Sequence, residues 1–120
     1  MSVGNHRLLY HGSQMFNFLG ILSQGLRIAP PEAPATGYMF GKGVYFADMF
    51  AKSLQYSRGR FGVPTGDSTI LLLCDVALGK MKRLYEATNV EKLEKPFSSV
   101  HGVGKNGPDH TKSLIHPEGV

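Results

Sequence analysis

The sequence contains no tryptophan and a single cysteine, Cys74, in 120 residues. One cysteine excludes an internal disulfide and indicates a reducing compartment, either the cytosol or the nucleus. Long apolar runs are also absent, because the longest, Ile70 to Leu73, is far too short to cross a bilayer. We therefore expect no membrane partner, and no signal peptide at the polar start of the chain.

Charge is scarce as well, since Asp, Glu, Lys and Arg make up 18% of the residues. The net charge of +4 favours an anionic ligand, whether a dinucleotide, a nucleic acid or an acidic protein. The basic side chains are scattered rather than gathered in a stripe, which argues against direct DNA binding by this segment. Fifteen glycines and seven prolines argue against a helical bundle and predict one small, loop-rich domain or part of one.

The start of the chain predicts a strand followed by a helix. Leu8 to Tyr10 is a short apolar run that ends at His11-Gly12-Ser13, where glycine allows the backbone to approach a ligand closely. Ser13 is the expected N-cap of the helix and Gly25 marks its end. One face of this helix collects apolar side chains, which we expect to pack together. They are Met15, Phe18, Leu19 and Leu22.

Two further strands and one helix are predicted downstream. Val44 to Ala47 predicts a strand that presents Tyr45, and a helix follows Asp48 as far as about Ser57. Thr69 to Leu78 has the strongest strand pattern and predicts a central strand. Proline-rich and glycine-rich loops are expected at 29–36 and 57–68, and the end of the chain, 98–120, is expected to be loop-like.

Three side chains of the predicted helix after Asp48 converge on one patch. Lys52 and Tyr56 lie four residues apart and share a helix face, and Ser53 lies three residues before Tyr56. The ordinary interpretation is that Tyr45 and Tyr56 are half-buried amphipathic residues beside solvated neighbours. The alternative is a binding patch made of a lysine, a hydroxyl and aromatic rings, and the spacing does not choose between the two.

The wider sequence favours the binding patch. Leu8 to Ser57 closely resembles the catalytic domain of the poly(ADP-ribose) polymerases, especially the DNA-damage-activated nuclear group that serves DNA repair. The resemblance rests on the motif His11-Gly12-Ser13, the loop Gly25 to Pro34 and the segment Thr36 to Gly43, and it continues more weakly to Lys105. It implies an α+β chain with part of the ADP-ribosyltransferase fold, the N-terminal half, in which an antiparallel-rich mixed β-sheet is joined by short helices.

The resemblance also implies a role for each matching residue. The Gly12 backbone and the Ser53 hydroxyl would hydrogen-bond the carboxamide of nicotinamide, while Tyr56 stacks on its ring. Tyr45 would line the same pocket, and His11 and Ser13 would hold ribose hydroxyls. Asn17 and Arg27 would lie toward the adenosine, and Tyr38 would cover the nucleotide. Lys52 would lie near the catalytic carboxylate. His11, Tyr45 and Lys52 are thus the implied catalytic residues, NAD is the implied substrate, and no metal is implied.

The chemistry of the implied reaction explains these residue types and exposes a gap. Breaking the bond between nicotinamide and ribose builds positive charge on the sugar, so a site must hold the leaving group, grip the hydroxyls and place a carboxylate nearby. A neutral His11 imidazole can grip a hydroxyl with one donor and one acceptor. The family's catalytic glutamate lies on a late strand in an Asn-Glu-Tyr-like setting, and no glutamate here has it. The glutamates are Glu32, Glu86, Glu91, Glu94 and Glu118.

We therefore expect one partial poly(ADP-ribose) polymerase catalytic domain over residues 1–120, incomplete at both ends and inactive alone. The parent protein would transfer ADP-ribose from NAD to protein acceptors in the nucleus and release nicotinamide. It would meet DNA only through parts absent from this segment. One alternative is a non-catalytic module that binds NAD or nicotinamide, and another is a truncated gene product.

Two other patterns are set aside. Gly102, Gly104 and Gly107 match a dinucleotide-binding turn, but no clear strand precedes them and Pro108 follows where a helix should begin. Cys74 and the later histidines lack the spacing of a zinc site. Cys74 is expected to be a small buried side chain rather than a nucleophile, because no neighbour in sequence would lower its pKa.

Overall fold

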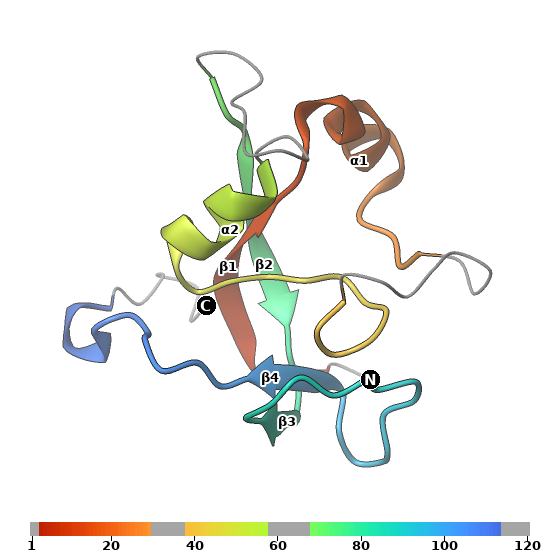
Figure 1. Cartoon of the computed structure of the whole chain (residues 1–120), viewed down its shortest axis with the longest axis vertical. Helices are drawn as coiled ribbons and strands as arrows, with labels where there is room; N and C mark the ends of the chain where they lie inside the picture. Colours follow the sequence, from red (N-terminus) through yellow and green to blue (C-terminus); the bar gives the residue numbers. More distant parts are fainter. Residues whose placement is uncertain (1–2, 30–37, 58–67, 114–120) are drawn as a thin grey trace.

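The computed structural model describes residues 3–29, 38–57 and 68–113. In chain order the elements are β1 (His6–Gly12), the 3-10 helix η1 (Met15–Asn17), α1 (Phe18–Gln24), α2 (Phe50–Ser57), β2 (Leu71–Ala77), β3 (Met81–Leu84), β4 (Ser99–Gly102) and the 3-10 helix η2 (His110–Lys112). Short helices and strands thus share one chain, which confirms the α+β class (Figure 1). Apart from their end residues, the loops predicted at 29–36 and 57–68 lie outside the described residues.

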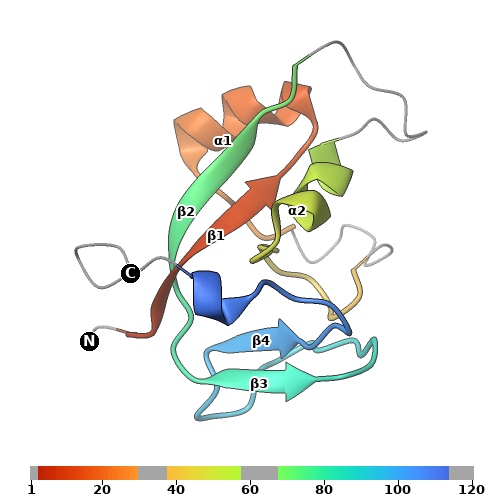
Figure 2. The ribbon, with the colours of Figure 1, turned by 90° about the vertical axis from the view of Figure 1, so that its left-hand side faces the viewer.

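Two small sheets form the framework. β1 pairs with β2 in the antiparallel sense, with Leu9 opposite Cys74, and β3 pairs with β4 in parallel. Figure 2 shows the longer β1–β2 pair with α2 against it and the β3–β4 pair at its foot. The mixed, antiparallel-rich pairing predicted for the sheet is therefore confirmed. Within the described ranges, however, β2 pairs with β1 alone, so it is not the central strand that was predicted.

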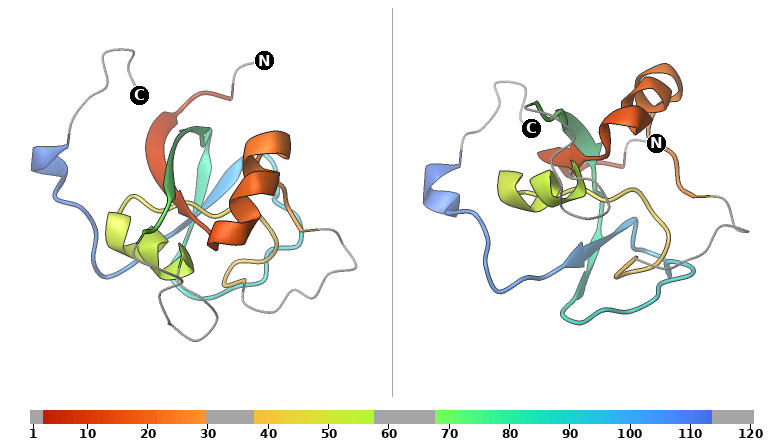
Figure 3. Two further views of the ribbon diagram at one scale, coloured as in Figure 1. Left: turned by 90° about the horizontal axis from the view of Figure 1, so that it is seen from above. Right: turned by 45° about the horizontal axis from the view of Figure 1, so that its top comes forward.

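The first helix departs from its prediction in packing. Of its four apolar residues Phe18 is 4% exposed, whereas Leu19 and Leu22 are 82% and 74% exposed. Met15 is also classed as exposed. Seen from above, α1 lies apart from α2 beside the end of β1 (Figure 3), and Phe18 alone of these four side chains is buried. The expectation that all four side chains pack together is therefore wrong for three of them.

The ends of this helix follow the sequence in part. Gly25 follows α1 with a φ of 78°, the left-handed conformation that glycine adopts at low cost, as predicted. Ser13 is not the N-cap, because the helical region opens as η1 after Gln14, with no side-chain cap bond there. The Ser13 hydroxyl instead accepts a hydrogen bond of 3.0 Å from the Asn17 amide.

The strand predicted at Val44 to Ala47 is reduced to a single bridge. Ala47 exchanges two backbone hydrogen bonds with Tyr10, of 2.8 and 2.9 Å, whereas residues 44–46 belong to no strand and residues 41–43 form bends. The cause lies in Gly41, whose φ is 88°, and in Tyr45, whose hydroxyl bonds the backbone of this turn. A chain that folds back on itself in this way cannot extend along β1.

The loop expected throughout 98–120 is also wrong for Ser99–Gly102, which form β4. A strand whose parallel partner lies far away in sequence has little local pattern to reveal it. β4 does precede the three-glycine pattern, so one ground for setting that pattern aside was wrong. Packing explains its first glycine, because a Cβ on Gly102 would lie 2.4 Å from the Phe40 ring.

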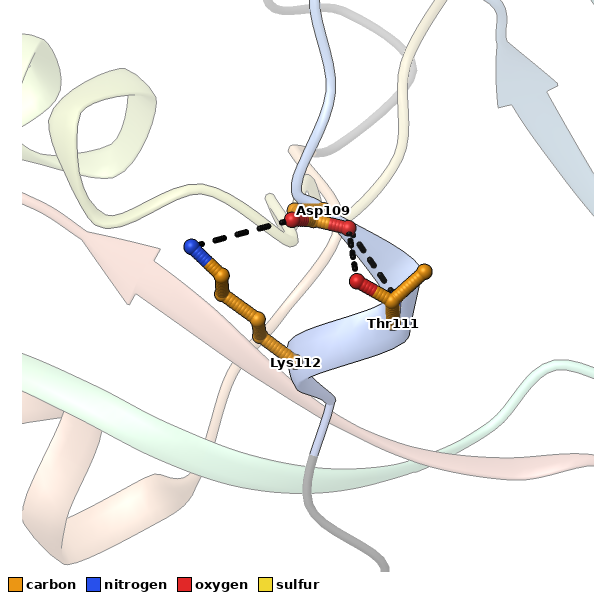
Figure 4. A network of polar contacts seen from close by, with 3 residues as sticks. All are labelled: Asp109, Thr111 and Lys112. Carbon is orange, nitrogen blue, oxygen red and sulfur yellow. Dashed lines mark hydrogen bonds and ion pairs between the residues drawn. The ribbon is translucent and has the colours of Figure 1, made fainter.

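The last described turn is held by one carboxylate. Asp109 accepts hydrogen bonds from the backbone N–H and the hydroxyl of Thr111, at 3.0 and 2.6 Å, and caps η2 (Figure 4). These bonds lower the pKa of the Asp109 carboxyl below its ordinary value. Lys112 lies 3.9 Å from the same carboxylate. No helix in the described part of the chain is long and apolar enough to span a membrane.

Candidate functional site

The site begins where α2 packs on β1. The Ser53 hydroxyl donates a hydrogen bond of 3.0 Å to the Tyr10 carbonyl, and Ser53 is only 2% exposed. A Cβ on Gly12 would lie 1.9 Å from the Ser53 carbonyl oxygen, a distance that no side chain could occupy. Phe50, at the start of the helix, meets the Tyr10 ring edge-on at 6.1 Å. The missing side chain of Gly12 is therefore what lets α2 approach the strand.

Gly12 also presents an open backbone edge. Tyr10 turns its N–H and C=O toward Ala47, away from β2, and successive strand residues alternate between the two edges. The N–H and C=O of Gly12 therefore point to the same edge as those of Tyr10. The next backbone acceptor along that edge is Tyr45, whose carbonyl is bound by a side chain instead. Within the described residues, no backbone group pairs with Gly12 on this edge.

The side chain that binds the Tyr45 carbonyl is His11. The distance from its Nδ1 to that oxygen is 2.7 Å, and its ring also meets Phe46 edge-on at 5.7 Å. Because a carbonyl can only accept, Nδ1 carries the proton, and in the neutral ring Nε2 is an acceptor. The His11 ring therefore has a fixed orientation and offers a ligand only Nε2. The sequence predicted that both a donor and an acceptor would be available.

Tyr45 gathers a cluster of tyrosine rings. Its hydroxyl accepts from the Phe40 N–H at 3.0 Å and donates to the Gly41 carbonyl at 2.6 Å. The Tyr38 ring lies 5.8 Å from the Tyr45 ring. Burial raises the pKa of Tyr45; the Phe40 hydrogen bond acts against this rise, and the nearby Tyr56 and Tyr38 add to it. Tyr38 and Tyr45 are thus in ring contact, and Tyr56 lies near enough to act on the pKa of Tyr45; these three residues are called the tyrosine cluster.

Replacing Tyr45 with phenylalanine should test how firmly this cluster is held. The variant leaves the Phe40 N–H and the Gly41 C=O without their partner, so we expect a loss of about 1–2 kcal/mol in the free energy of unfolding near pH 7. Because the pKa of Tyr45 is raised in the fold, its contribution is complete below the ordinary value of 10.0 and is lost as pH rises through the raised pKa. Urea unfolding of both proteins across this range measures the difference. Equal stability at neutral pH would contradict the role given to the hydroxyl.

Lys52 and Tyr56 share a face of α2, as predicted. The Lys52 ammonium lies 5.8 Å from the centroid of the Tyr56 ring. Tyr56 is 50% exposed, so part of its ring is available to a ligand. Among the described ion pairs, none includes Lys52. The ammonium therefore interacts with an aromatic face and not with a carboxylate.

The residues implied for the adenosine side form a looser group. Ser13 and Asn17 are joined by the hydrogen bond described above, and Asn17 is exposed. Arg27 is exposed and donates to the Gln24 side chain. Its described hydrogen bond is therefore to its own neighbourhood and not to the tyrosine cluster.

Three of the described carboxylates form ion pairs that include no residue of the tyrosine cluster. Asp48, just before α2, is exposed. Asp75 pairs with His6, Glu94 with Lys82 and Asp109 with Lys112. Glu86 and Glu91 are exposed and flank Thr88 and Val90, whose backbone bonds the turn at Met39 and Phe40. The described residues contain no group of three or more His, Cys, Asp or Glu side chains able to hold a metal. Cys74 is half-buried rather than fully buried, and this burial raises the pKa of its thiol, which does not favour the reactive thiolate.

Sequence reasoning missed two supports of the site. Val90 packs beneath the turn, because a Cβ on Gly41 would lie 2.5 Å from its carbonyl oxygen. Ser57 is 7% exposed, and its buried hydroxyl, which has no partner among the described residues, lies 3.1 Å from where a Gly12 Cβ would be. Ser57 follows Ser53 by one helical turn, so the spacing could have placed it beside Gly12. No local pattern could have placed Val90 there.

The arrangement suits a flat, neutral amide on an aromatic ring. A primary amide needs one acceptor and one donor side by side, and the backbone of one extended residue offers that pair. Aromatic side chains at the same edge provide stacking surfaces. An imidazole acceptor lies one residue away on the strand. These are the groups that a nicotinamide riboside would engage.

Comparison with known proteins identifies the family of the chain. The family model described as the poly(ADP-ribose) polymerase catalytic domain matches residues 1–120. The chain is 55% identical over 98% of its length to poly [ADP-ribose] polymerase 1 of Caenorhabditis elegans, and 54% identical over 97% to poly [ADP-ribose] polymerase 2 of Arabidopsis thaliana. It is 57% identical over 89% to poly [ADP-ribose] polymerase 1 of Gallus gallus.

The chain spans only a small part of these relatives, 12%, 18% and 10% of their lengths respectively. The match nevertheless covers all the residues that form the edge, the tyrosine cluster and the lysine. The chain therefore belongs to the poly(ADP-ribose) polymerase catalytic domain family.

Proposed function

We propose that these 120 residues form part of a poly(ADP-ribose) polymerase catalytic domain and bind the nicotinamide end of NAD. The observation that carries the proposal is the open Gly12 edge beside the tyrosine cluster. Family membership supports it, because an NAD glycosyl bond is what such a domain would break. NAD is the proposed substrate and no metal takes part.

The carboxamide would be held by the backbone. In this arrangement the Gly12 N–H donates to the carboxamide oxygen and the Gly12 C=O accepts from its NH₂ group. The Ser53 hydroxyl donates to the Tyr10 carbonyl at the same edge and keeps lone pairs that can accept the second amide hydrogen. Ser53 thereby holds α2 in place and completes the amide site.

The ring and the ribose would be held by side chains. Tyr56 provides the stacking surface, and Tyr45, fixed through its hydroxyl, lines the pocket. His11 Nε2 accepts from a ribose hydroxyl, with Ser13 beside it. Asn17, Arg27 and Tyr38 would lie toward the adenosine, and Lys52 near the carboxylate of the complete domain.

The parent protein would be a nuclear ADP-ribosyltransferase that acts on protein acceptors, and DNA would be bound by its other parts. No glutamate of this segment has the Asn-Glu-Tyr-like setting of the family's catalytic residue, which favours the second candidate function for this segment by itself. That function is a module that binds nicotinamide or NAD without turning it over. A truncated gene product would be expected to bind neither.

A pair of ligands that differ only in the amide tests the proposed site. Nicotinamide and nicotinate are titrated separately into the chain and followed by NMR shifts of the Gly12 and Tyr56 resonances. Nicotinamide should saturate, and nicotinate should bind at least about ten-fold more weakly, because its carboxylate has no hydrogen for the Gly12 carbonyl. Equal binding of both ligands, or saturable binding of neither, would refute the amide site.

A further inference from the structure

The placement of Lys52 bears on the charge of the ligand, and the point rests on the proposed nicotinamide site. The Lys52 ammonium lies 5.8 Å from the centroid of the Tyr56 ring, and no described ion pair neutralises it. Asp48, two residues before the start of α2, is exposed and forms no ion pair with Lys52 within 4 Å. The tyrosine ring therefore already has a full positive charge near its π-system.

A ligand stacked on the exposed part of the Tyr56 ring would interact electrostatically with the Lys52 ammonium across that ring. The nicotinamide ring of NAD is a pyridinium cation, whereas released nicotinamide is neutral. A second cation on the ring would face the ammonium at about 9 Å, a separation over which charges in a partly solvated site still repel each other. A neutral pyridine of the same shape does not experience that repulsion.

We propose that Lys52 acts through Tyr56 as a charge-discriminating residue, which disfavours the pyridinium form of the ring and favours neutral nicotinamide. The effect belongs to this segment, in which no described ion pair includes Lys52. A carboxylate placed beside the ammonium in the complete domain would offset its charge.

Lys52 is thus a positioning residue in this inference, and its effect differs from a contact with a carboxylate. If Lys52 were paired with a carboxylate, its role would be to position that carboxylate. Its replacement would then not change the preference between charged and neutral rings. The helix supplies the geometry, because residues four apart on α2 place the ammonium beside the ring. Both side chains are exposed, so replacing Lys52 should not disturb the fold.

The test compares nicotinamide with 1-methylnicotinamide, which has the same amide but a permanent pyridinium charge. Dissociation constants for both are measured by NMR titration at low ionic strength in wild type, Lys52→Met and Lys52→Arg. The methionine variant keeps the length of the side chain and loses its charge, while the arginine variant keeps the charge. Lys52→Met should bind 1-methylnicotinamide about five-fold more tightly relative to nicotinamide. Lys52→Arg should retain the wild-type ratio.

Added salt should shrink the difference between wild type and Lys52→Met, because it screens the repulsion. A ratio that is the same in wild type and Lys52→Met overturns the inference and leaves the nicotinamide site intact. Failure of both probes to saturate any of the three proteins overturns the proposed function together with the inference. A merely structural lysine would change both affinities equally.

Discussion

Replacing Gly12 with alanine is expected to cause the largest loss of stability of any single substitution in the site. The new Cβ would lie 1.9 Å from the Ser53 carbonyl oxygen and 2.8 Å from its carbonyl carbon. Both atoms belong to the backbone of α2, so no side-chain rotation can relieve the overlap. The helix must shift away from β1, at a cost on the order of 3 kcal/mol or more. The shift would also break the hydrogen bond from Ser53 to Tyr10 and remove nicotinamide binding.

Gly20 provides the matched control. It lies in α1, and a Cβ there would have nothing within 4 Å. Gly20→Ala should therefore be neutral or stabilise the protein by up to about 1 kcal/mol, because alanine is the better helix former. Urea unfolding of the two variants measures the contrast. If Gly12→Ala were as stable as Gly20→Ala and still bound nicotinamide, the close packing of α2 on β1 would be incorrect.

The second large effect is an absence of turnover. The purified chain is expected to consume NAD no faster than a sample without protein. No glutamate of the chain has the setting of the family's catalytic residue. An oxocarbenium-like transition state without a nearby carboxylate loses stabilisation that substrate binding does not replace. The measurement is nicotinamide release from NAD, followed over hours at saturating NAD.

Consumption of NAD at about one molecule per second per chain, a rate common for enzymes, would contradict this expectation. The carboxylate responsible could then be identified by substitution, with Glu32→Gln and Glu118→Gln as the first variants, since both positions lie outside the described residues. Binding without turnover would instead match the segment's role as a nicotinamide-binding part of the domain.

The local sequence pattern predicted those elements whose conformation depends mainly on residues close together in the chain. β1, α2 and β2 follow from apolar runs and helical spacing, and Gly25 ends α1 because glycine adopts a positive φ at low cost. The β-branched and aromatic residues of Val44 to Ala47 indicated a strand, and nothing in their local pattern argued against one. What bends it is the bond from the Tyr45 hydroxyl back to the turn, a contact that propensity does not contain. β4 was missed for a related reason, because its partner β3 lies across a long connection.

The same division applies to the site. Lys52, Ser53 and Tyr56 could be grouped from spacing, since they lie within two turns of one helix. Their meeting with Gly12 depends on how α2 docks on β1, and the state of His11 depends on a carbonyl 34 residues away. The family resemblance supplied those long-range relations, and the structure supplied their physical reasons. The apolar face of α1 was overestimated, because periodicity says which side chains share a face and not whether anything covers it.

The measurement that most directly tests the nicotinamide site is a titration of nicotinamide into wild type and Tyr56→Ala. Removal of the ring should weaken binding about ten-fold or more, as loss of an aromatic stacking partner does elsewhere. Tyr85→Ala is the control, because Tyr85 is 72% exposed and lies just after β3. Saturable binding in wild type and in the control, with loss in Tyr56→Ala, is the predicted result. Equal, weak binding in all three proteins would contradict the site.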